Sequence, residues 1–283
     1  MQTLQPYYGN VQSHYDLSDD FFALFLDPSR TYSCAYFEND DASLEQAQRA
    51  KIDLALGKCD LKPGMALLDI GCGWGSTCQR AAEHHGAKVI GLTLSRNQHA
   101  YAKHLTRGLP VEIRLQGWEE FDEPVDRIVS IGAFEHFRRE RFPAFFERCH
   151  RLLPGDAHML LHTIVLVDEA TLTARGGVLQ HEDLLFAKFI RKYIFPGGQL
   201  VEPRIIVDAA EAAGFVVERQ HSLQAHYVRT LELWAANLAT AREPAIACTS
   251  AATYDIFMRY LTGCAQHFRA GHIDVIQFTL RRS

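Results

Sequence analysis

A glycine-rich turn is the segment of this chain whose residue types point most directly to a ligand. Residues 67–75 read Leu-Leu-Asp-Ile-Gly-Cys-Gly-Trp-Gly, so a short apolar run ends in Asp69 and continues into Gly71, Cys72 and Gly73. Glycine adopts backbone conformations that other residues avoid, and it lets the main chain approach a bound molecule closely. Between a strand and a helix such a turn predicts a nucleotide site, although a tight turn without a ligand is the alternative.

The residues after the second apolar run bear on which nucleotide would bind. They read Gly-Leu-Thr-Leu-Ser-Arg-Asn-Gln over residues 91–98, without a carboxylate. A dinucleotide site usually has an acid about 20 residues after the glycine turn to hold the ribose, so NAD is disfavoured. Arg96 leaves NADP open because it could bind the 2′-phosphate; a solvated residue at a helix start is the alternative. Thr93 and Gln98 can hydrogen-bond hydroxyls without an acid.

Two further loops place acids beside aromatic residues. Trp118 and Glu119 follow the third apolar run, where they could flank a purine or lie at the surface. Glu135 follows the fourth run within Ala-Phe-Glu-His-Phe. A carboxylate buried among apolar side chains needs a partner because an unpaired buried charge is costly. Glu135 is therefore either a site residue or a partly exposed loop acid.

Strands alternating with helices would position these loops. The apolar runs predict strands at 66–70, 88–92, 111–115, 126–131, 158–165 and 275–280. Amphipathic stretches predict helices at 15–27, 43–56, 76–85, 96–106, 140–153, 182–194, 205–213, 229–241 and 252–270. This alternation predicts an α/β fold around a parallel sheet. Residues 167–199 are expected as an insertion over the edge of the sheet where ligands bind.

The composition argues against several classes of protein. The 283 residues include 29 Lys and Arg against 34 Asp and Glu, a formal net charge of −5, whereas nucleic-acid binders usually show a basic excess. No apolar run approaches the roughly 18 residues of a membrane-spanning helix, and no secretory signal pattern is visible. Seven scattered cysteines without a Cys-x-x-Cys pair predict reduced thiols in a cytoplasmic protein, and neither a disulfide frame nor a zinc site.

Together these motifs resemble the mycolic acid cyclopropane synthases, which belong with the cyclopropane-fatty-acyl-phospholipid synthases among the S-adenosylmethionine-dependent methyltransferases. The matching segments are HYDLSDDFF, TYSCAYF, LLDIGCGWG, GLTLSRNQ, GWEEFDEPVDRIVSIGAFEHF, LLHTIV, IFPGG, SLQAHYVRTL and YLTGCAQHFR. The resemblance implies a Rossmann-like class I methyltransferase fold, with a seven-stranded, mostly parallel sheet in a single domain. Its parts would be an N-terminal helical lid (1–60), a cofactor-binding core (62–165), a substrate-pocket insertion (167–200) and the C-terminal part of the fold (201–283).

The resemblance implies S-adenosylmethionine as the cofactor and assigns residues to its parts. The glycine turn would receive the methionine part, and the segment around Thr93 the ribose. Trp118 and Glu119 match the adenine side, while Tyr32 and Ser33 match contacts from the N-terminal lid. The missing acid after the second strand is normal for this group. The implied cofactor-binding residues are Tyr32, Ser33, Asp69, Gly71, Cys72, Gly73, Thr93, Leu94, Gln98, Trp118, Glu119 and Ile131.

The family reaction adds the methyl group of the cofactor to a cis double bond of a long acyl chain, and loss of a methyl proton from the resulting carbocation closes a cyclopropane ring. The alkene must lie in line with the sulfonium methyl group, aromatic faces can stabilise the cation, and a base must take a proton inside an apolar pocket. In the family this base is thought to be bound bicarbonate. Its cage matches Cys34, Glu135, His162 and Tyr227, with the backbone N–H of Ile131.

Further residues have two interpretations each. Tyr15, Phe134, Phe137 and Tyr260 are candidates for stabilising the cation or lining the acyl tunnel, and core packing is the alternative. Cys264 matches a family cysteine described as an active-site residue. Structural burial is the preferred alternative for Cys264, because methyl transfer to an alkene needs no nucleophile.

Two departures from the family concern the acyl substrate. Arg138-Arg139 replaces a Gly-His pair of many members, and with Arg141, Arg148 and Arg151 it forms a basic stretch. This stretch would be a site for an acidic carrier protein or an anionic headgroup, or simply a solvated helix face. Residues 167–180 of the insertion also diverge. The implied partners are a long-chain unsaturated acyl substrate and either an acyl carrier protein or a transient membrane surface, without nucleic acid.

Other functions stay open at this point. Related enzymes quench the same cation with water, giving a hydroxyl and a methyl branch, or leave a methylated alkene. The acceptor could be another small lipid. More remote alternatives are an NADP-dependent oxidoreductase that uses Arg96 and a non-catalytic lipid-binding protein.

Overall fold

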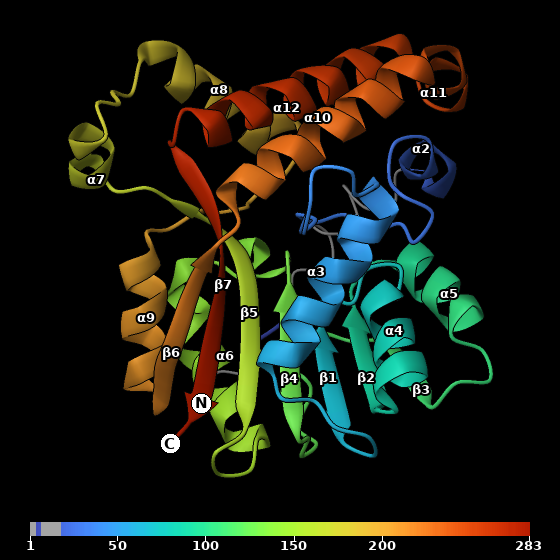
Figure 1. Cartoon of the computed structure of the whole chain (residues 1–283), viewed down its shortest axis with the longest axis vertical. Helices are drawn as coiled ribbons and strands as arrows, with labels where there is room; N and C mark the ends of the chain where they lie inside the picture. The colour runs from blue at the N-terminus through green and yellow to red at the C-terminus, as the bar shows by residue number, and fades with distance from the viewer. Residues whose placement is uncertain (1–3, 7–17) are drawn as a thin grey trace.

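A seven-stranded sheet organises the part of the chain that the computed structural model describes, residues 4–6 and 18–283 (Figure 1). Its strands are β1 (Ala66–Ile70), β2 (Lys88–Thr93), β3 (Val111–Leu115), β4 (Arg127–Ile131), β5 (His158–Leu166), β6 (Phe215–Ser222) and β7 (Ile273–Arg282). They lie in the order β3-β2-β1-β4-β5-β7-β6. The first five strands are parallel, whereas β7 runs antiparallel to β5 and β6. The expected seven-stranded, mostly parallel sheet is confirmed.

Helices cover both faces of the sheet. The helices α3 (Leu44–Lys58), α4 (Ser76–His85) and α5 (Arg96–Leu105) share one apolar cluster with the sheet, and α6 (Phe142–Leu152) and α9 (Pro203–Ala212) share another. Successive side chains of a strand point to opposite faces. In β1, Leu67 accordingly joins the cluster of α3 and α4, while Leu68 joins that of α6 and α9.

A third group of helices lies around the edge at which the parallel strands end (Figure 1). It comprises α2 (Asp19–Ala23), α7 (Glu169–Ala174), α8 (His181–Tyr193), α10 (Gln224–Thr240), α11 (Arg242–Cys248) and α12 (Ala251–Arg269). Buried rings from these helices, together with Phe25 just after α2, form an aromatic cluster of Phe21, Phe22, Phe25, Phe189, Tyr227, Trp234, Phe257, Tyr260 and Phe268. No helix of the described residues is long and apolar enough to cross a membrane.

The boundaries differ from the expected ones where local patterns are weak. The expected helix at 15–27 is only α2 within the described residues, and residues 15–17 lie outside them. The expected helix at 140–153 begins at Phe142 after a 3-10 turn, Arg139–Arg141. Strand β6 and the helices α7 and α11 were not expected. Most side chains of β6 are exposed or half-buried, so its sequence lacks the apolar alternation that predicts a strand.

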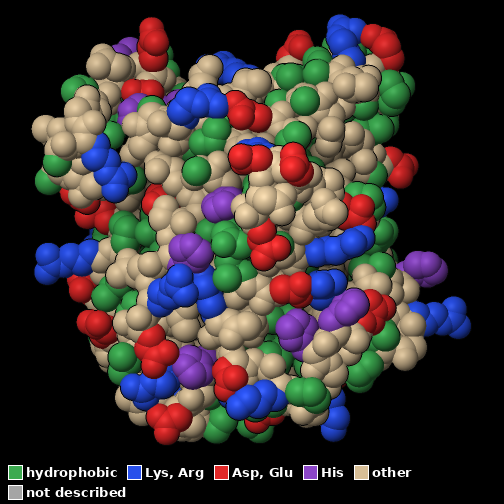
Figure 2. Space-filling view, in the orientation of Figure 1, with side chains coloured by type: hydrophobic (Ala, Val, Ile, Leu, Met, Phe, Trp, Pro, Cys, Tyr) green, Lys and Arg blue, Asp and Glu red, His purple; other side chains and the backbone are tan. Residues whose placement is uncertain are grey.

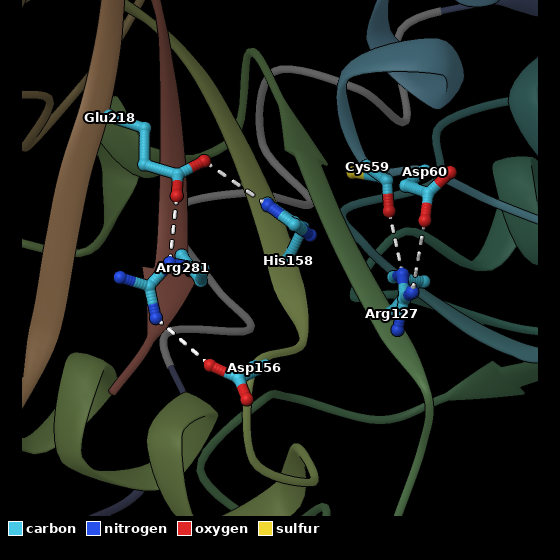
Figure 3. A network of polar contacts seen from close by, with 7 residues as sticks. All are labelled: Cys59, Asp60, Arg127, Asp156, His158, Glu218 and Arg281. Atoms are coloured by element: carbon cyan, nitrogen blue, oxygen red, sulfur yellow. Dashed lines mark hydrogen bonds and ion pairs between the residues drawn. The ribbon is translucent and has the colours of Figure 1, made fainter.

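Charged side chains of both signs are interspersed over the face drawn in Figure 2. Some of them form a network at the edge of the sheet where the parallel strands begin (Figure 3). Arg281 pairs with both Asp156 and Glu218, and Arg127 donates to the Cys59 carbonyl at 2.6 Å. Such pairs stabilise only modestly, by about 0–1 kcal/mol each. This edge therefore holds structural contacts, and the ligand pocket opens at the opposite edge.

Candidate active site

A pocket at the carboxyl ends of β1 and β2 brings the expected cofactor-binding residues together. Its wall is formed by the lid segment 30–33, the glycine turn, the end of β2 and the loops after β3 and β4. All members of the expected set line it: Tyr32, Ser33, Asp69, Gly71, Cys72, Gly73, Thr93, Leu94, Gln98, Trp118, Glu119 and Ile131. In a sheet of this type the crevice beyond the carboxyl ends of the strands is where ligands bind.

The glycine turn is held in place by the neighbouring strand. The backbone N–H groups of Gly71 and Cys72 both donate to the carbonyl of Leu92, at 2.9 and 2.8 Å. Gly71 has φ +85°, and a Cβ there would collide with Ala133. Gly73 has φ +56°, and a Cβ there would meet nothing within 4 Å. Gly71 is thus required by the fold, whereas Gly73 faces open space where a ligand can approach.

The polar residues at the end of β2 are oriented before any ligand binds. The hydroxyl of Thr93 donates to Gln98 Oε1 at 2.8 Å, and Ser95 caps the helix that carries Gln98. Arg96, by contrast, is exposed and is not among the pocket-lining residues. The NADP hypothesis therefore loses the residue on which it depended.

Trp118 and Glu119 are buried, so the interpretation of Trp118 as a surface residue is wrong. The Trp118 indole packs edge-to-face on Phe145, with ring centroids 5.3 Å apart. Glu119 Oε1 accepts from Arg141 at 2.9 Å, while Glu119 Oε2 is buried and has no hydrogen-bond partner among the described residues. A free acceptor in the pocket wall fits an amino group such as that of adenine. The donor set of the pocket thus fits S-adenosylmethionine.

Sequence reasoning missed Lys51 in the pocket wall. This fully buried lysine of α3 donates to the Ser33 hydroxyl at 2.6 Å. Burial lowers its pKa to about 8, against the opposing charges of Cys34, Asp27 and Asp69. Burial likewise raises the pKa of Asp69 to about 7. Lysine in a helix is ordinarily solvated, so no local pattern could have identified it.

Replacing Lys51 with Met is expected to weaken S-adenosylmethionine binding by about tenfold or more, because losing one hydrogen bond to a charged group costs about 1.5–3 kcal/mol. The change removes the contact that holds Ser33 and takes a cation from the pocket wall. Isothermal titration calorimetry would measure it. Arg49→Met, an exposed change on the same helix, is the control. Equal affinities of the two variants would contradict the placement of Lys51.

The catalytic candidates are not among the residues that line the pocket. Two of them, Glu135 and His162, each have one buried side-chain atom without a hydrogen-bond partner among the described residues. Glu135 Oε1 accepts from the Ile164 N–H at 2.7 Å. Glu135 Oε2 and His162 Nε2 are both buried without a hydrogen-bond partner among the described residues. Desolvation raises the pKa of Glu135, against hydrogen bonds to its carboxylate from the Ile164 N–H and the Thr163 hydroxyl, and it lowers the pKa of His162. Although Glu135 as a residue is half-buried, its Oε2 is therefore shielded from solvent.

A chain of hydrogen bonds fixes the tautomer of His162. Lys58 Nζ donates to Gln277 Oε1 at 2.6 Å, which orients the amide. Gln277 Nε2 lies 3.3 Å from His162 Nδ1 and can only donate. His162 Nδ1 must then accept, so a neutral ring carries its hydrogen on Nε2. His162 Nε2–H is thus a buried donor and Glu135 Oε2 a buried acceptor.

The remaining cage candidates lie around the Tyr227 hydroxyl. Burial raises the pKa of Tyr227 well above its usual value, and the nearby Cys34, Glu135 and Cys264 add to the effect. The Cys34 thiol contacts the Leu223 carbonyl, which also accepts from the Tyr227 N–H. Burial raises the pKa of Cys264 to about 12, so this thiol is protonated at neutral pH and is unsuited to nucleophilic attack.

The aromatic candidates separate into two environments. Phe134 stacks on Phe142 in the core beneath the sheet, with centroids 4.1 Å apart, whereas Phe137 lines the cofactor pocket. Tyr260 belongs to the aromatic cluster, and its hydroxyl accepts from the Tyr32 hydroxyl at 3.2 Å. Tyr15 lies outside the described residues. Tyr260 is thus placed between the cofactor pocket and the aromatic cluster.

Two acids pair with three arginines of the basic stretch after Glu135. Arg141 pairs with Glu119, and Arg148 and Arg151 both pair with Asp122. The Arg139 N–H donates to Gln199 Oε1 at 3.0 Å. Arg141 is thus held by a buried acid, whereas Arg148 and Arg151 share one exposed carboxylate. The site for an acidic carrier protein or an anionic headgroup stays a prediction.

His162 predicts a specific pH effect on stability. Below about pH 6.5 the unfolded chain protonates this histidine while the folded chain does not, so its contribution to the free energy of unfolding falls by up to about 1.4 kcal/mol per pH unit. Asp69 and Glu135 act in the opposite sense, because their raised pKa values make the folded chain bind protons first. The comparison is therefore between the wild type and His162→Gln, by urea unfolding at about pH 7.5 and about pH 5.5. Acidification should destabilise the wild type more than the variant; equal changes would contradict the assignment.

Comparison with known proteins connects the whole chain with one family. The family model for mycolic acid cyclopropane synthetase matches residues 2–278. Cyclopropane mycolic acid synthase 3 of Mycobacterium tuberculosis is 55% identical over 283 residues, which cover 99% of both chains. The structure of the cyclopropane synthase MmaA2 from Mycobacterium tuberculosis matches with a TM-score of 0.97 and 52% identity. That of mycolic acid cyclopropane synthase CmaA1 complexed with SAH and CTAB matches with a TM-score of 0.94 and 54% identity, and each structure comparison covers 99% of both chains.

Proposed function

The chain belongs to the mycolic acid cyclopropane synthetase family, and from this premise we propose that it converts a cis double bond of a long unsaturated acyl chain into a cyclopropane. As a member of that family it is an S-adenosylmethionine-dependent methyltransferase. The observation that carries the proposal is the pairing of a complete cofactor pocket with a buried donor and acceptor, His162 Nε2 and Glu135 Oε2.

The reaction requires an apolar site that holds one base able to accept a proton. S-adenosylmethionine, when bound, supplies an electrophilic methyl group; the alkene electrons form the new C–C bond as the C–S bond breaks. A C–H bond of the added methyl group must then lose its proton, and its electron pair closes the ring. The aromatic cluster shields the cation from water, and its ring faces stabilise positive charge.

Bicarbonate fits the donor and acceptor of the buried site. It has one O–H, which Glu135 Oε2 can accept, and an anionic oxygen, to which His162 Nε2–H and the Tyr227 hydroxyl can donate. When bound it would supply the base that an apolar pocket otherwise lacks. The chain's own residues would hold the bicarbonate. A buried anion is tolerated when hydrogen bonds of this kind pair it, whereas a buried anion without them is costly.

Incubation with methyl-labelled S-adenosylmethionine tests the reaction. The acceptors would be cis-unsaturated acyl chains on phospholipid and on carrier protein, with products identified by mass spectrometry and proton NMR. We expect the label in a ring methylene. A labelled methyl beside a hydroxyl, or on a retained alkene, would overturn ring closure while leaving methyl transfer intact. Cofactor binding without any labelled lipid would overturn the acyl substrate.

We propose that a lipid surface delivers the acyl chain at α8. The exposed apolar side chains Val178, Leu179, Leu184, Leu185 and Tyr193 all lie on or just before this helix. Lys188, Arg191 and Lys192 are exposed beside them. Exposed apolar residues among cations are typical of helices that rest on anionic membranes. All seven cysteines are free thiols, which supports placing this encounter in the cytoplasm.

The double variant Leu184→Ser/Leu185→Ser is expected to bind anionic phospholipid vesicles at least about tenfold more weakly, because each leucine contributes roughly 1.5–3 kcal/mol when it is buried. Vesicle co-sedimentation would measure the difference. Val216→Ser removes an exposed apolar side chain from β6 and is the control. Unchanged vesicle binding by the double variant would exclude α8 as the contact.

A further inference from the structure

Three residues from separate elements meet beside the inserted segment: Asp183 of α8, His267 of α12 and His272 just before β7. Asp183 Oδ1 lies 3.2 Å from His267 Nε2 and 3.5 Å from His272 Nδ1. The ligand atoms of all three lie within 4.8 Å of one another. The side chains are only 11–18% exposed. None of them belongs to the cofactor pocket or to the catalytic set described above.

Hydrogen bonds on the outer side of the cluster determine which atoms face inward. His267 Nδ1 lies 2.8 Å from the Gly263 carbonyl, which can only accept. Nδ1 therefore carries the hydrogen and a neutral ring has its lone pair on Nε2. Asp183 Oδ2 accepts from the Gln180 N–H at 2.7 Å at the start of α8, which leaves Oδ1 for the cluster. A neutral His267 would thus turn a lone pair toward a carboxylate oxygen at 3.2 Å, which is unfavourable unless a metal ion or a proton lies between the two atoms.

Two histidine nitrogens face the Asp183 carboxylate at the centre of the cluster. His267 Nε2 and His272 Nδ1 are buried without a hydrogen-bond partner among the described residues. The His267 ring is fixed by stacking on Phe186, with centroids 4.4 Å apart. Gly263 makes this packing possible, because a Cβ there would collide with the Phe186 ring. The ring cannot easily turn away to find another partner.

We propose that Asp183, His267 and His272 bind a divalent transition-metal ion of the zinc type. Zinc bonds of about 2.0–2.2 Å in a tetrahedron place neighbouring ligand atoms about 3.3–3.6 Å apart, close to the two separations observed. Imidazole and carboxylate are ordinary ligands for such ions, and a histidine ligand commonly donates its other N–H to a carbonyl, as His267 does. Three protein ligands leave one position for water.

The ion would fasten the insertion to the body of the protein. Helix α8 carries Asp183 at its start and the exposed leucines of the proposed lipid contact further along. Its partners His267 and His272 lie on either side of the turn between α12 and β7 (Figure 1). A bond between these elements would hold α8 in place over the aromatic cluster, to which Phe189 of α8 belongs.

Equilibrium dialysis of the full chain against Zn²⁺ with a weak competing chelator tests the site. The wild type should retain one zinc equivalent, and His267→Phe and His272→Phe, which keep a ring but lose the nitrogen, should retain at least about tenfold less at the same free zinc. His104 is an exposed residue of α5, and His104→Phe should retain as much zinc as the wild type. Circular dichroism would verify folding, and Asp183→Asn is the substitute for any variant that does not fold.

Thermal unfolding provides a second measurement that does not depend on catalysis. Zn²⁺ should raise the unfolding temperature of the wild type and of His104→Phe, and not that of the two cluster variants, because an ion that binds only the folded state stabilises it. Equal zinc retention by the wild type and both cluster variants would overturn the proposal. So would a wild type that binds no zinc and shows an imidazolium in its NMR spectrum, since a proton would then occupy the centre.

Discussion

Turnover of the Glu135→Gln variant is expected to fall by about 10²–10⁴-fold, the usual contribution of acid–base catalysis, while its affinity for S-adenosylmethionine stays nearly unchanged. Glu135 Oε1 is engaged by the Ile164 N–H, and an amide oxygen can keep that contact. The buried Oε2 becomes an NH₂ group, which cannot accept the O–H of a bound base. The labelled-methyl assay and calorimetric titration of the cofactor measure the two quantities separately.

The control for this prediction is Glu140→Gln, the same chemical change on an exposed acid a few residues away. It should leave both turnover and cofactor affinity as in the wild type. If Glu135→Gln keeps activity within a few-fold, the carboxylate does not hold the base. A loss of cofactor affinity equal to the loss of turnover would place Glu135 at the cofactor instead.

Gly73→Asp should have the opposite profile, with cofactor binding weakened at least about 100-fold, or about 2.7 kcal/mol. Asp tolerates the left-handed conformation of this position better than most residues, and its Cβ would meet nothing within 4 Å. The fold should therefore survive. The new carboxylate enters the space expected to hold the methionine part of the cofactor, where it meets another carboxylate.

Two variants distinguish the effect of the new charge on cofactor binding from the effect of added bulk and from that of Asp at positive φ. Gly73→Asn adds the same bulk without the charge, so its loss of affinity should lie between those of the wild type and Gly73→Asp. Gly64→Asp also places Asp at positive φ in open space, but on the turn before β1 at the far edge of the sheet. It should bind the cofactor normally. Normal binding by Gly73→Asp would refute the placement of the methionine part at this turn.

Six of the seven strands and the outline of the cofactor pocket could be predicted from the sequence. Apolar runs separated by amphipathic helices dictate parallel strands, and the loops after those strands then meet at one edge. The glycine turn follows β1 directly, Thr93 is the last residue of β2, and Trp118 and Glu135 lie in the loops after β3 and β4. Their convergence is a consequence of strand order, so strand positions and motif resemblance together identified twelve of the residues that line the pocket, although not Lys51.

Only the tertiary structure decided the state of the polar side chains. Lys51 is buried because Ser33 lies over it, and His162 has a fixed tautomer because Gln277, 115 residues away, lies beside it. The counter-charge of Arg141 comes from Glu119 across the pocket wall. The scattered cysteines predicted no zinc site, and that expectation considered only neighbours in sequence.

The proposed metal site likewise depends on contacts between segments that are far apart in the sequence. Asp183 and His272 are separated by almost the whole C-terminal part of the chain, and nothing near either one indicates a ligand. Local patterns report which residues prefer to be buried or helical, because those preferences act over a few residues. Whether a buried polar atom finds a partner depends on contacts between distant segments, and these are fixed only when the chain has packed.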